Sequence, residues 1–577
     1  MTEPHIHFTI SFIEPQAHYV EIEMAISHFA ETTLDIKMPV WTPGSYLIRE
    51  YGRHVEEVNA FDGSNHINCI KVAKNTWRIK KPSIHTKIRY RVYGFETSVR
   101  TNMITADRAF LSSAATFMYI ENYLHLPCTV QVVLPENWHY ISTGLPKKTQ
   151  DENIFYAENF DILFDSPLEI GNQDIWYFEA AGIPHEFAMV GGGNYNKQQL
   201  TTDITKIVEE ETAIWGENPN TNYVFITHNY QTGGGGLEHL NSTVLAASRN
   251  AYQTTSSYKN FLGLVAHEYF HLWNVKRLRP KALGPFNYDE ENYTTGLWIM
   301  EGFTSYYDNL VIRRCGFLSP EEYLDALAND FNLVYNRPGH RIQSAALASF
   351  DAWIKHYRPD ENTMNTGISY YNKGAMLAVA LDLYILAETQ GQKRLDDVLR
   401  AAYIHFYKNE NRGFEEQEFQ TLAENVTDVN LTDIFHAAHT TDELDYNHYF
   451  HRVGYELLDL YQDNQALSLG IKIANQEGRV IVKNVERSSG AWDAGIHVDD
   501  ELIAINGNRL DPAGKELDFI LQNGYIDEIV DVLASRDGLI RTIHAPLRPS
   551  TKQQWSIQEK VDATTAEKRL GKMWLSV

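Results

Sequence analysis

The sequence predicts a multidomain α+β protein, with an antiparallel β domain first, a mostly helical domain in the middle and a small β domain near the C-terminus. Three observations support this prediction. The chain has 577 residues, which is too many for a single hydrophobic core. Residues 1–165 alternate apolar and polar side chains with the period of a β-strand, whereas helical periodicity dominates the middle of the chain. Short strand patterns separated by turn residues return in residues 455–550.

Residues 1–165 are expected to form a sandwich or saddle of antiparallel strands. The segments HIHFTISF, YVEIEMAI and KIRYRVYGF each alternate apolar and polar residues. Turn-forming segments such as FDGSN and TGLPKK lie between such patterns, and no long helical pattern interrupts them.

Residues 166–445 are expected to form the middle domain, which begins after the junction segment DSPLEIG. NYVFITHNY predicts a strand, and four long apolar segments predict helices over residues 256–278, 297–314, 319–336 and 372–391. The polar segment 440–449 predicts a linker.

The ends of three helices are marked by capping signals. Ser256 or Ser257 is the expected N-cap of the first helix. Ser319 and Glu322 occupy capping-box positions in the third, which has proline at its first position. Gly391 is the expected C′ glycine of the fourth.

Composition excludes several classes of function. The formal net charge of −25 disfavours nucleic acid and anionic membranes as partners. Cys69, Cys128 and Cys315 are far apart, so neither a disulfide framework nor a cysteine-rich zinc site is expected. The N-terminus lacks a signal-peptide pattern and no apolar run reaches about 18 residues, so the sequence predicts a cytoplasmic protein.

His267, Glu268 and His271 form an HExxH motif within the predicted helix 256–278. Residues four apart on a helix share one face, so the two imidazoles point in the same direction. Neutral histidines at this spacing suit tetrahedral Zn²⁺, and Glu268 is placed to take a proton from water that the metal activates. Because the flanking residues are apolar, these polar side chains are expected to be buried and to need partners. The motif therefore predicts a zinc site.

A catalytic zinc of this kind needs a third protein ligand, usually a carboxylate. Glu290 is the nearer candidate, but it lies in the polar, loop-like run NYDEENYTT. Glu301 lies in LWIMEGFTSYY, where a carboxylate among apolar residues is costly unless a cation meets it. The physical argument therefore selects Glu301, and Glu290 is interpreted as a solvated surface acid.

Four glycines, Gly233 to Gly236, precede Leu237, Glu238 and His239. Glycine is useful where another chain must approach the backbone closely. The run has no lysine and is followed by a carboxylate, so a phosphate loop is disfavoured and a cationic guest fits better.

HEYFHLWNVKRLRP together with LWIMEGFTSYY resembles the glycyl aminopeptidase family of zinc metallopeptidases. The resemblance extends to WTPGSYLIREYGRHV, to DSPLEIG and to the C-terminal module, and so covers most of the chain. It implies a thermolysin-like catalytic domain over residues 166–445. It also implies that His267, His271 and Glu301 hold one zinc ion per chain and that Glu268 is the general base.

The same resemblance assigns roles at the glycine run and near residue 371. In larger related aminopeptidases a Gly-x-Met-Glu-Asn stretch holds the free α-ammonium group of the substrate. GGLEH is similar to it, which implies that Glu238 binds the amine and that Gly235, Gly236 and His239 contact the substrate. ISYYNKGAML resembles the stretch whose tyrosine stabilises the oxyanion, which implies Tyr371, with Tyr370 as the neighbouring alternative.

Two further residues are candidates for orienting the histidines. Ser305 lies one turn after Glu301 and Asp308 nearly two turns after it. Solvated helix positions are the favoured interpretation of both.

The segments SLGIKI, GRVIVKNV and DELIAINGNRL read like a PDZ domain, here within residues 455–550 and followed by a polar tail, residues 551–577. PDZ domains add a peptide as an extra strand and hold its C-terminal carboxylate with backbone amides. The corresponding loop contains Leu469, Gly470 and Ile471. A purely structural PDZ domain is the alternative.

The sequence as a whole predicts a zinc aminopeptidase that removes N-terminal residues from peptides, with the resemblance implying a preference for Gly or Ala. A zinc endopeptidase with the same site and a peptide-binding adaptor with a vestigial peptidase fold are the alternatives. The expected partners are peptides with a free N-terminus and, at the PDZ domain, peptide C-termini.

Overall fold

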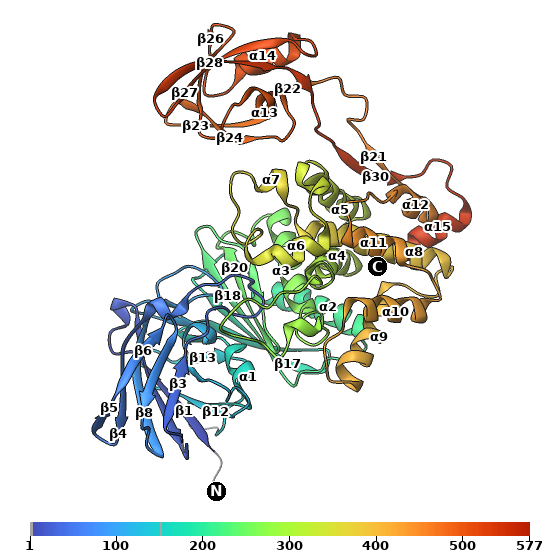
Figure 1. Ribbon diagram of the computed structural model, residues 1–577. Helices are drawn as coiled ribbons and strands as arrows, with labels where there is room; N and C mark the ends of the chain where they lie inside the picture. The colour runs from blue at the N-terminus through green and yellow to red at the C-terminus, as the bar shows by residue number, and fades with distance from the viewer. Residues whose placement is uncertain (1–3, 30, 150–152, 577) are drawn as a thin grey trace.

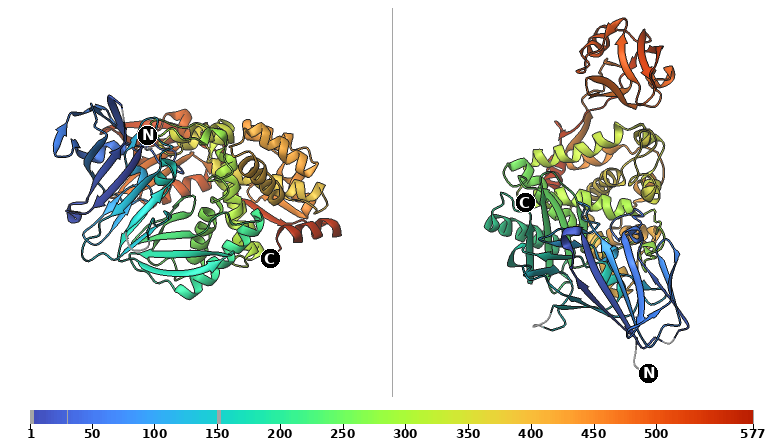
Figure 2. Two further views of the ribbon diagram at one scale, coloured as in Figure 1. Left: turned by 90° about the horizontal axis from the view of Figure 1, so that it is seen from below. Right: turned by 90° about the vertical axis from the view of Figure 1, so that its left-hand side faces the viewer.

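The computed structural model describes residues 4–29, 31–149 and 153–576. Figure 1 shows three regions in chain order: a β domain at one end, a helical body in the middle and a second β domain at the other end. Figure 2 shows that an extended connection joins the C-terminal β domain to the helical body. The predicted multidomain α+β fold is therefore confirmed.

The N-terminal domain consists of a seven-stranded sheet, of order β14-β12-β1-β2-β8-β4-β5, and two four-stranded sheets, β11-β3-β7-β6 and β13-β15-β10-β9. Its elements are β1 (His5–Ser11), β2 (Tyr19–Ser27), β3 (Thr33–Lys37), β4 (Val55–Asp62), β5 (Asn65–Ile67), β6 (Cys69–Ala73), β7 (Thr76–Lys80), β8 (His85–Tyr93), β9 (Met103–Ile104), β10 (Ala109–Leu111), β11 (Tyr119–Ile120), β12 (Cys128–Val132), β13 (Tyr140–Thr143), β14 (Ile154–Ala157), α1 (Phe160–Phe164) and β15 (Leu168–Gly171).

The alternation in the sequence reflects one buried face of each strand. In β2, every second residue from Val20 to Ile26 is buried and the intervening ones are half-buried. β1 pairs antiparallel with β2, as expected, but parallel with β12. That parallel pair joins segments more than a hundred residues apart, which local sequence patterns do not report.

The middle region combines a five-stranded sheet, β16-β17-β18-β20-β19, with a bundle of helices. Its elements are β16 (Asp174–Ala180), β17 (Ile183–Val190), α2 (Lys197–Trp215), β18 (Tyr223–Tyr230), β19 (Gly236–Glu238), β20 (Ser242–Ser248), α3 (Thr255–Phe270), α4 (Leu297–Arg314), α5 (Pro320–Tyr335), α6 (Ala345–Phe350), α7 (Thr363–Thr366), α8 (Tyr370–Glu388), α9 (Leu395–Ala402), the π-helix η7 (Tyr403–Asn409), α10 (Glu416–Thr427), α11 (Thr432–His439) and α12 (Tyr446–Phe450).

The sequence located these helices well, with differences at their ends. Ser319 and Glu322 form the predicted capping box of α5. The N-cap of α3 is Thr254 rather than Ser256 or Ser257, because the Thr254 side chain accepts the Ser257 N–H. α3 also ends at Phe270, well before residue 278. Gly391 has a φ of 85° and donates its N–H to the Leu386 carbonyl at 2.8 Å, which closes the end of α8.

The segment 440–449 is not a linker. It contains the start of α12, whose residues Tyr446, Tyr449 and Phe450 are buried against the helical body. The free energy gained by burying these large aromatic rings exceeds the cost of ordering the short polar segment around them, so the segment folds onto the helical body.

Two central helices, α4 and α8, approach each other at glycines. A Cβ atom on Gly302 would lie only 2.4 Å from the Cα of Gly374. Gly302 follows Glu301 directly and Gly374 lies one turn after Tyr371. The close crossing therefore fixes the distance between the side chains that the two helices carry.

The C-terminal β domain is inserted into a pair of strands that belongs to the helical body. β21 (Tyr455–Asp459) pairs antiparallel with β30 (Trp555–Glu559), and the domain lies between them in the chain. The elements that follow β21 are β22 (Leu467–Ser468), β23 (Ile471–Gln476), β24 (Arg479–Val485), α13 (Gly490–Ala494), β25 (Glu501–Ile505), β26 (Asn508–Arg509), α14 (Lys515–Asn523), β27 (Ile529–Arg536), β28 (Leu539–Pro546), β29 (Arg548–Pro549), β30 and α15 (Thr565–Trp574).

The last segment of the chain packs against the helical body. Trp574, at the end of α15, is fully buried, and its Nε1 donates to the hydroxyl of Tyr306 at 3.0 Å. Among the described helices, none combines the length and apolar character that a membrane span requires.

Candidate metal centre

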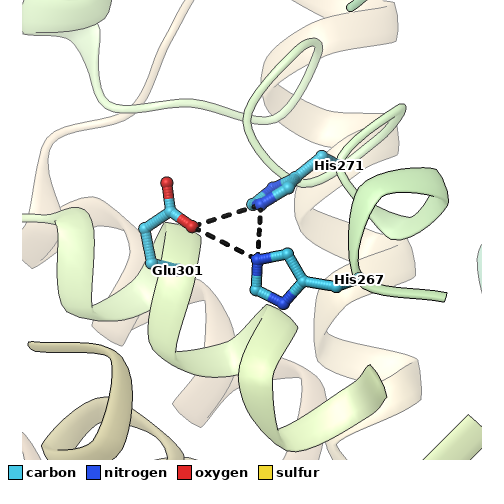
Figure 3. Close-up of side chains that lie close together, drawn as sticks. All are labelled: His267, His271 and Glu301. Carbon is cyan, nitrogen blue, oxygen red and sulfur yellow. Dashed lines mark hydrogen bonds and ion pairs between the residues drawn. The ribbon is translucent and has the colours of Figure 1, made fainter. Parts of the chain in front are cut away.

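Three side chains converge between α3 and α4 (Figure 3). The Nε2 atoms of His267 and His271 lie 3.2 Å apart. One carboxylate oxygen of Glu301, Oε2, lies 3.6 Å from the first and 3.2 Å from the second. His267 comes from the last turn of α3, His271 is the C-cap residue that follows this helix, and Glu301 comes from the second turn of α4. The structure therefore brings the three predicted ligands together.

The donor set fits a zinc ion. Two imidazole nitrogens and one carboxylate oxygen, all within 4.8 Å of one another, are the ligand types that catalytic zinc sites use. Burial alone would raise the pKa of Glu301, but the imidazoles of His271 and His267 outweigh it and hold the pKa at about 2. The carboxylate is therefore ionised and available as a ligand.

Each histidine is oriented through its other ring nitrogen. Nδ1 of His271 lies 2.7 Å from the backbone carbonyl of Asn274, which can only accept, so this nitrogen is the donor and Nε2 is left free. Nδ1 of His267 lies 3.0 Å from Oδ2 of Asp308 on α4. Such partners fix the ring orientation and the tautomer of metal-ligating histidines.

Asn274 also ties the end of α3 to α4. Its side-chain Nδ2 lies within hydrogen-bond distance of the carbonyls of Ile299 and Met300, the two residues before Glu301. The contact holds the two ligand-bearing helices in register.

The carboxylate of Glu268 lies beside the cluster and lines the same cavity. Its Oε2 is buried without a hydrogen-bond partner within the described part of the chain. Burial raises the pKa of Glu268 to about 7. A Cβ atom on Gly236 would lie 2.3 Å from Oε1 of Glu268, so glycine is needed for the strand and the carboxylate to lie this close.

Glu238 lies on β19, the edge strand of the five-stranded sheet. Its side chain is buried, and its Oε1 has no hydrogen-bond partner among the described residues. Gly44, from the N-terminal domain, faces this carboxylate: its φ is 82°, and a Cβ atom there would lie 2.5 Å from Oε1. Two domains therefore build this carboxylate site together.

Tyr371 lines the same cavity. Its ring centroid lies 6.2 Å from that of His267, with the rings 25° apart. Burial, followed by the negative charge of Glu301, raises its pKa, so the hydroxyl remains a donor at neutral pH. Tyr370 is fully buried and does not line the cavity.

A cavity of about 820 Å³ connects these groups. Eight residues that the sequence predicted for the site line this cavity: Gly235, Gly236, Glu238, His267, Glu268, His271, Glu301 and Tyr371. Ser305 and Asp308 also line it. The polar groups that the sequence assigned to one site thus face one space.

His239 does not line this cavity, contrary to its predicted contact with substrate. Its Nδ1 lies 3.1 Å from Asp165 Oδ1, and the ring is buried against the junction between the first two domains. Glu290 is exposed in a loop and accepts a hydrogen bond from Asn287 at 2.8 Å.

The sequence analysis gave one residue of the site too little weight and missed others. Asp308 was favoured as a solvated position but is the partner of His267. Its spacing of nearly two turns from Glu301 was the signal that it shares the ligand face. Asn274, Gly44 and Arg100 had no local signal, because they reach the site through contacts between distant segments.

Comparisons with known proteins agree with this geometry. The profile of the peptidase M61 N-terminal domain matches residues 7–172, and that of the M61 glycyl aminopeptidase matches residues 260–377, which include the whole ligand cluster. The chain belongs to the M61 glycyl aminopeptidase family. The PDZ domain profile matches residues 459–517 of this M61 protein. Because of the match to the M61 glycyl aminopeptidase, the protein is a peptidase, a hydrolase that acts on peptide bonds.

One solved structure shares the fold of the M61 protein over almost its whole length. The crystal structure of an aminopeptidase N family protein from Idiomarina loihiensis shares 27% sequence identity and a TM-score of 0.91, over 99% of this chain and 100% of that one. An M1 zinc metallopeptidase from Deinococcus radiodurans shares 11% identity and a TM-score of 0.48, over 76% of this chain and 94% of that one. The comparison with curated proteins found no match.

The predicted PDZ loop of this M61 protein connects β22 to β23. Gly470 has a φ of 74° and its N–H donates to Ser468 Oγ at 2.8 Å. Leu469 is buried and Ile471 begins β23, the edge strand of the domain's main sheet. A free sheet edge is the feature that strand addition of a peptide requires.

Proposed function

We propose that this M61 peptidase is a zinc aminopeptidase that removes small N-terminal residues from peptides. The observation that carries the proposal is the buried carboxylate of Glu238, which has an unpartnered oxygen and shares a cavity with the cluster of His267, His271 and Glu301. An unpartnered buried carboxylate is costly, and the free α-ammonium of a peptide supplies the missing partner.

His267, His271 and Glu301 would hold one zinc ion. When bound there, zinc supplies Lewis-acid polarisation of the scissile carbonyl and lowers the pKa of water. Asp308 and the Asn274 carbonyl keep the histidine rings oriented for this role.

The proton transfers fall to Glu268. Its carboxylate accepts the proton of the attacking water and then delivers it to the amine nitrogen that leaves, so the residue ends each cycle unchanged. The Tyr371 hydroxyl donates a hydrogen bond to the oxygen that gains negative charge as the carbonyl carbon becomes tetrahedral.

Glu238 limits cleavage to the first peptide bond. It pairs with the α-ammonium, and a substrate with a blocked amine leaves its charge uncompensated. The wall beside it supports small first residues: a side cavity of about 80 Å³, lined by Trp41, Gly44 and Tyr46 among others, adjoins Glu238. A first side chain that enters this side cavity must be small.

The test compares glycyl and alanyl arylamides with their N-acetylated forms. We expect the wild type to cleave the free-amine substrates, to lose activity with a chelator and to regain it with zinc. Acetylation should abolish cleavage. Glu238→Ala and the isosteric Glu238→Gln should lower the preference for a free amine on the order of 10- to 100-fold.

Two results would contradict the proposal. Cleavage of acetylated substrates at the same rate as free ones indicates an endopeptidase with the same zinc chemistry. A Glu238→Gln enzyme that keeps the wild-type ratio of free to blocked substrate removes the role of amine anchor from this residue.

A further inference from the structure

Arg100 reaches the cavity from the N-terminal domain. It lies in the loop between β8 and β9, and its Nη2 donates to the backbone carbonyl of Gly236 at 3.0 Å. It lines the cavity together with Glu238, Glu268 and the three candidate metal ligands. It is thus a cation at a site that is otherwise rich in carboxylates.

The guanidinium of Arg100 is incompletely paired. Within the described residues it forms no ion pair with a carboxylate, and the bond from Nη2 to the Gly236 carbonyl is the one hydrogen bond that the guanidinium makes. Its Nε is buried without a partner. A half-buried guanidinium with so few partners lacks the acceptor oxygens that such groups normally find in folded proteins. The N–H groups of Arg100 that face the cavity are therefore available to an acceptor atom of a ligand.

The register of β19 indicates which ligand atom this is. Gly236 lies two residues before Glu238 on the strand, and an extended chain advances about 3.3 Å per residue, so the two positions are about 6 to 7 Å apart. A peptide held by its amine at Glu238 and extended along the strand places the carbonyl of its second residue at about this distance. Gly236 also lies against Glu268, the group that serves the leaving nitrogen.

We propose that Arg100 binds the carbonyl or carboxylate oxygen of the residue that follows the scissile bond. The inference rests on the proposed aminopeptidase function, with the substrate amine at Glu238. It makes Arg100 a substrate-binding residue that favours true peptides over substrates with an aromatic amine as leaving group. It also gives the N-terminal domain a direct contact with substrate, in addition to the approach of Gly44 to Glu238.

The experiment uses the full-length zinc-loaded enzyme with Arg100→Met and Arg100→Lys. The substrates are alanyl-alanine, its amide, trialanine and alanine p-nitroanilide, which lacks a carbonyl in the second position. Loss of a charge-assisted hydrogen bond should lower kcat/KM for the three peptides on the order of 10- to 100-fold in Arg100→Met. The anilide should change less than about threefold.

The two oxygen sources are distinguished by the same set of substrates. A larger loss for alanyl-alanine than for its amide shows that Arg100 pairs with a terminal carboxylate, and equal losses show that it binds a carbonyl. Arg100→Lys should retain part of the activity on alanyl-alanine, because the charge is kept and the planar fork is lost.

Arg89→Met is the matched control. Arg89 is exposed on β8 of the same domain, where it pairs with Glu23 at 2.8 Å. Its removal should change neither the ratio of kcat/KM for the peptides to that for the anilide nor the ratio for alanyl-alanine to that for its amide. Thermal melting of each variant separates misfolding from a loss of binding, and the wild type alone must already prefer alanyl-alanine to N-acetylated alanyl-alanine.

Equal losses on peptides and on the anilide would overturn the inference, because Arg100 would then only hold the Gly236 carbonyl in place. The inference would also be overturned if both Arg100 variants kept the wild-type ratio of kcat/KM for the peptides to that for the anilide. Failure of the wild type to require a free amine would instead contradict the proposed function, so the two failures are distinguishable.

Discussion

At the scale of single residues, the site depends on which atoms have partners and which do not. The two histidines use Nδ1 for hydrogen bonds and present Nε2 to each other and to Glu301. Glu238 and Glu268 each keep a buried carboxylate oxygen without a partner in the described chain. Both residues line the cavity with the ligand cluster, so each oxygen is placed to accept a hydrogen bond from a bound molecule.

We expect Glu268→Gln to keep zinc and to lose turnover. The amide has nearly the same shape but cannot accept a proton, so kcat on alanine p-nitroanilide should fall by about three orders of magnitude. Metal analysis of the purified variant should still give one zinc per chain.

Glu290→Gln is the control for this prediction, because Glu290 is an exposed acid on a loop. It should keep both zinc and activity. A Glu290→Gln enzyme without zinc would show that the third ligand has been assigned to the wrong glutamate.

Asp308→Ala should weaken zinc binding without removing a ligand. The change leaves Nδ1 of His267 without its acceptor at 3.0 Å, which frees the ring to rotate. Zinc affinity, measured by competition with a chromophoric chelator, should fall on the order of 10- to 100-fold. Asp325→Ala, at an exposed position on α5, should leave the affinity unchanged, and an equal loss in both variants would contradict the role of Asp308.

At the scale of elements, the crossing of α4 and α8 sets the geometry between Glu301 and Tyr371. The helices touch through Gly302 and Gly374, so no side chain separates their backbones at this point. Helices joined this closely by backbone contact hold their side chains in fixed register, since the spacing has no flexible side chain to absorb a shift.

Gly302→Ala should therefore destabilise the protein despite the higher helix propensity of alanine. The added methyl would lie 2.4 Å from the Cα of Gly374, and overpacking of this kind costs about 1 to 3 kcal/mol. Thermal unfolding should show a lower Tm. The matched control is Gly263→Ala in α3, where the nearest atom to the new methyl is 3.7 Å away, so Tm should rise or stay constant. Equal stability of the two variants would contradict the tight crossing.

At the scale of the whole molecule, charged side chains tie the N-terminal domain to the catalytic body. Asp165, at the junction, lies 2.6 Å from Lys276 Nζ and 3.1 Å from His239 Nδ1. Its Oδ2 also accepts the Leu240 N–H at 2.8 Å. Because Lys276 follows α3 and Leu240 follows β19, this one carboxylate connects both sides of the cavity to the junction.

The pair should give a pH dependence to stability. Burial alone would raise the pKa of Asp165, but Lys276 and then His239 outweigh it and hold the pKa below its usual value. The carboxylate therefore binds protons less readily in the folded than in the unfolded chain. Its stabilising contribution is fully present above the unfolded pKa of about 3.9 and is lost as pH falls through the lower folded pKa.

We expect Asp165→Asn to destabilise the protein by about 3 kcal/mol near pH 7, because Lys276 is left buried without its partner. In urea unfolding followed by tryptophan fluorescence, the difference from wild type should be constant between about pH 5 and 7 and narrow only below about pH 4. Lys74→Met, which breaks the exposed pair with Glu50, should change stability by less than about 1 kcal/mol. If the difference in unfolding free energy between wild type and Asp165→Asn grew as pH falls, the lowered pKa of Asp165 would be contradicted.

The second link at this scale joins the PDZ domain to the body. Asn365, which is buried within α7, donates to the carbonyl of Val485 at 2.9 Å and accepts the N–H of Arg487 at 2.8 Å. α7 lies only a few residues before Tyr371. The PDZ domain therefore contacts the wall of the catalytic region directly, in addition to its connection through β21 and β30.

The amino-acid sequence by itself determined what depends on neighbours along the chain. Period-two alternation predicted strands such as β2, the capping box predicted the start of α5, and four-residue spacing placed His267 and His271 on one face. The apolar surroundings of Glu301 selected it over Glu290, and the structure brings Glu301 to the two imidazoles. These features follow from local geometry, which a chain carries wherever it folds.

The tertiary structure alone decided what depends on distant segments. The parallel pairing of β1 with β12, the burial of α12, the turn of His239 towards Asp165 and the approach of Gly44 and Arg100 to β19 all join residues that are far apart in the chain. Neither periodicity nor spacing encodes such contacts, because they arise when whole domains pack and the free energy of the assembled core fixes which surfaces meet.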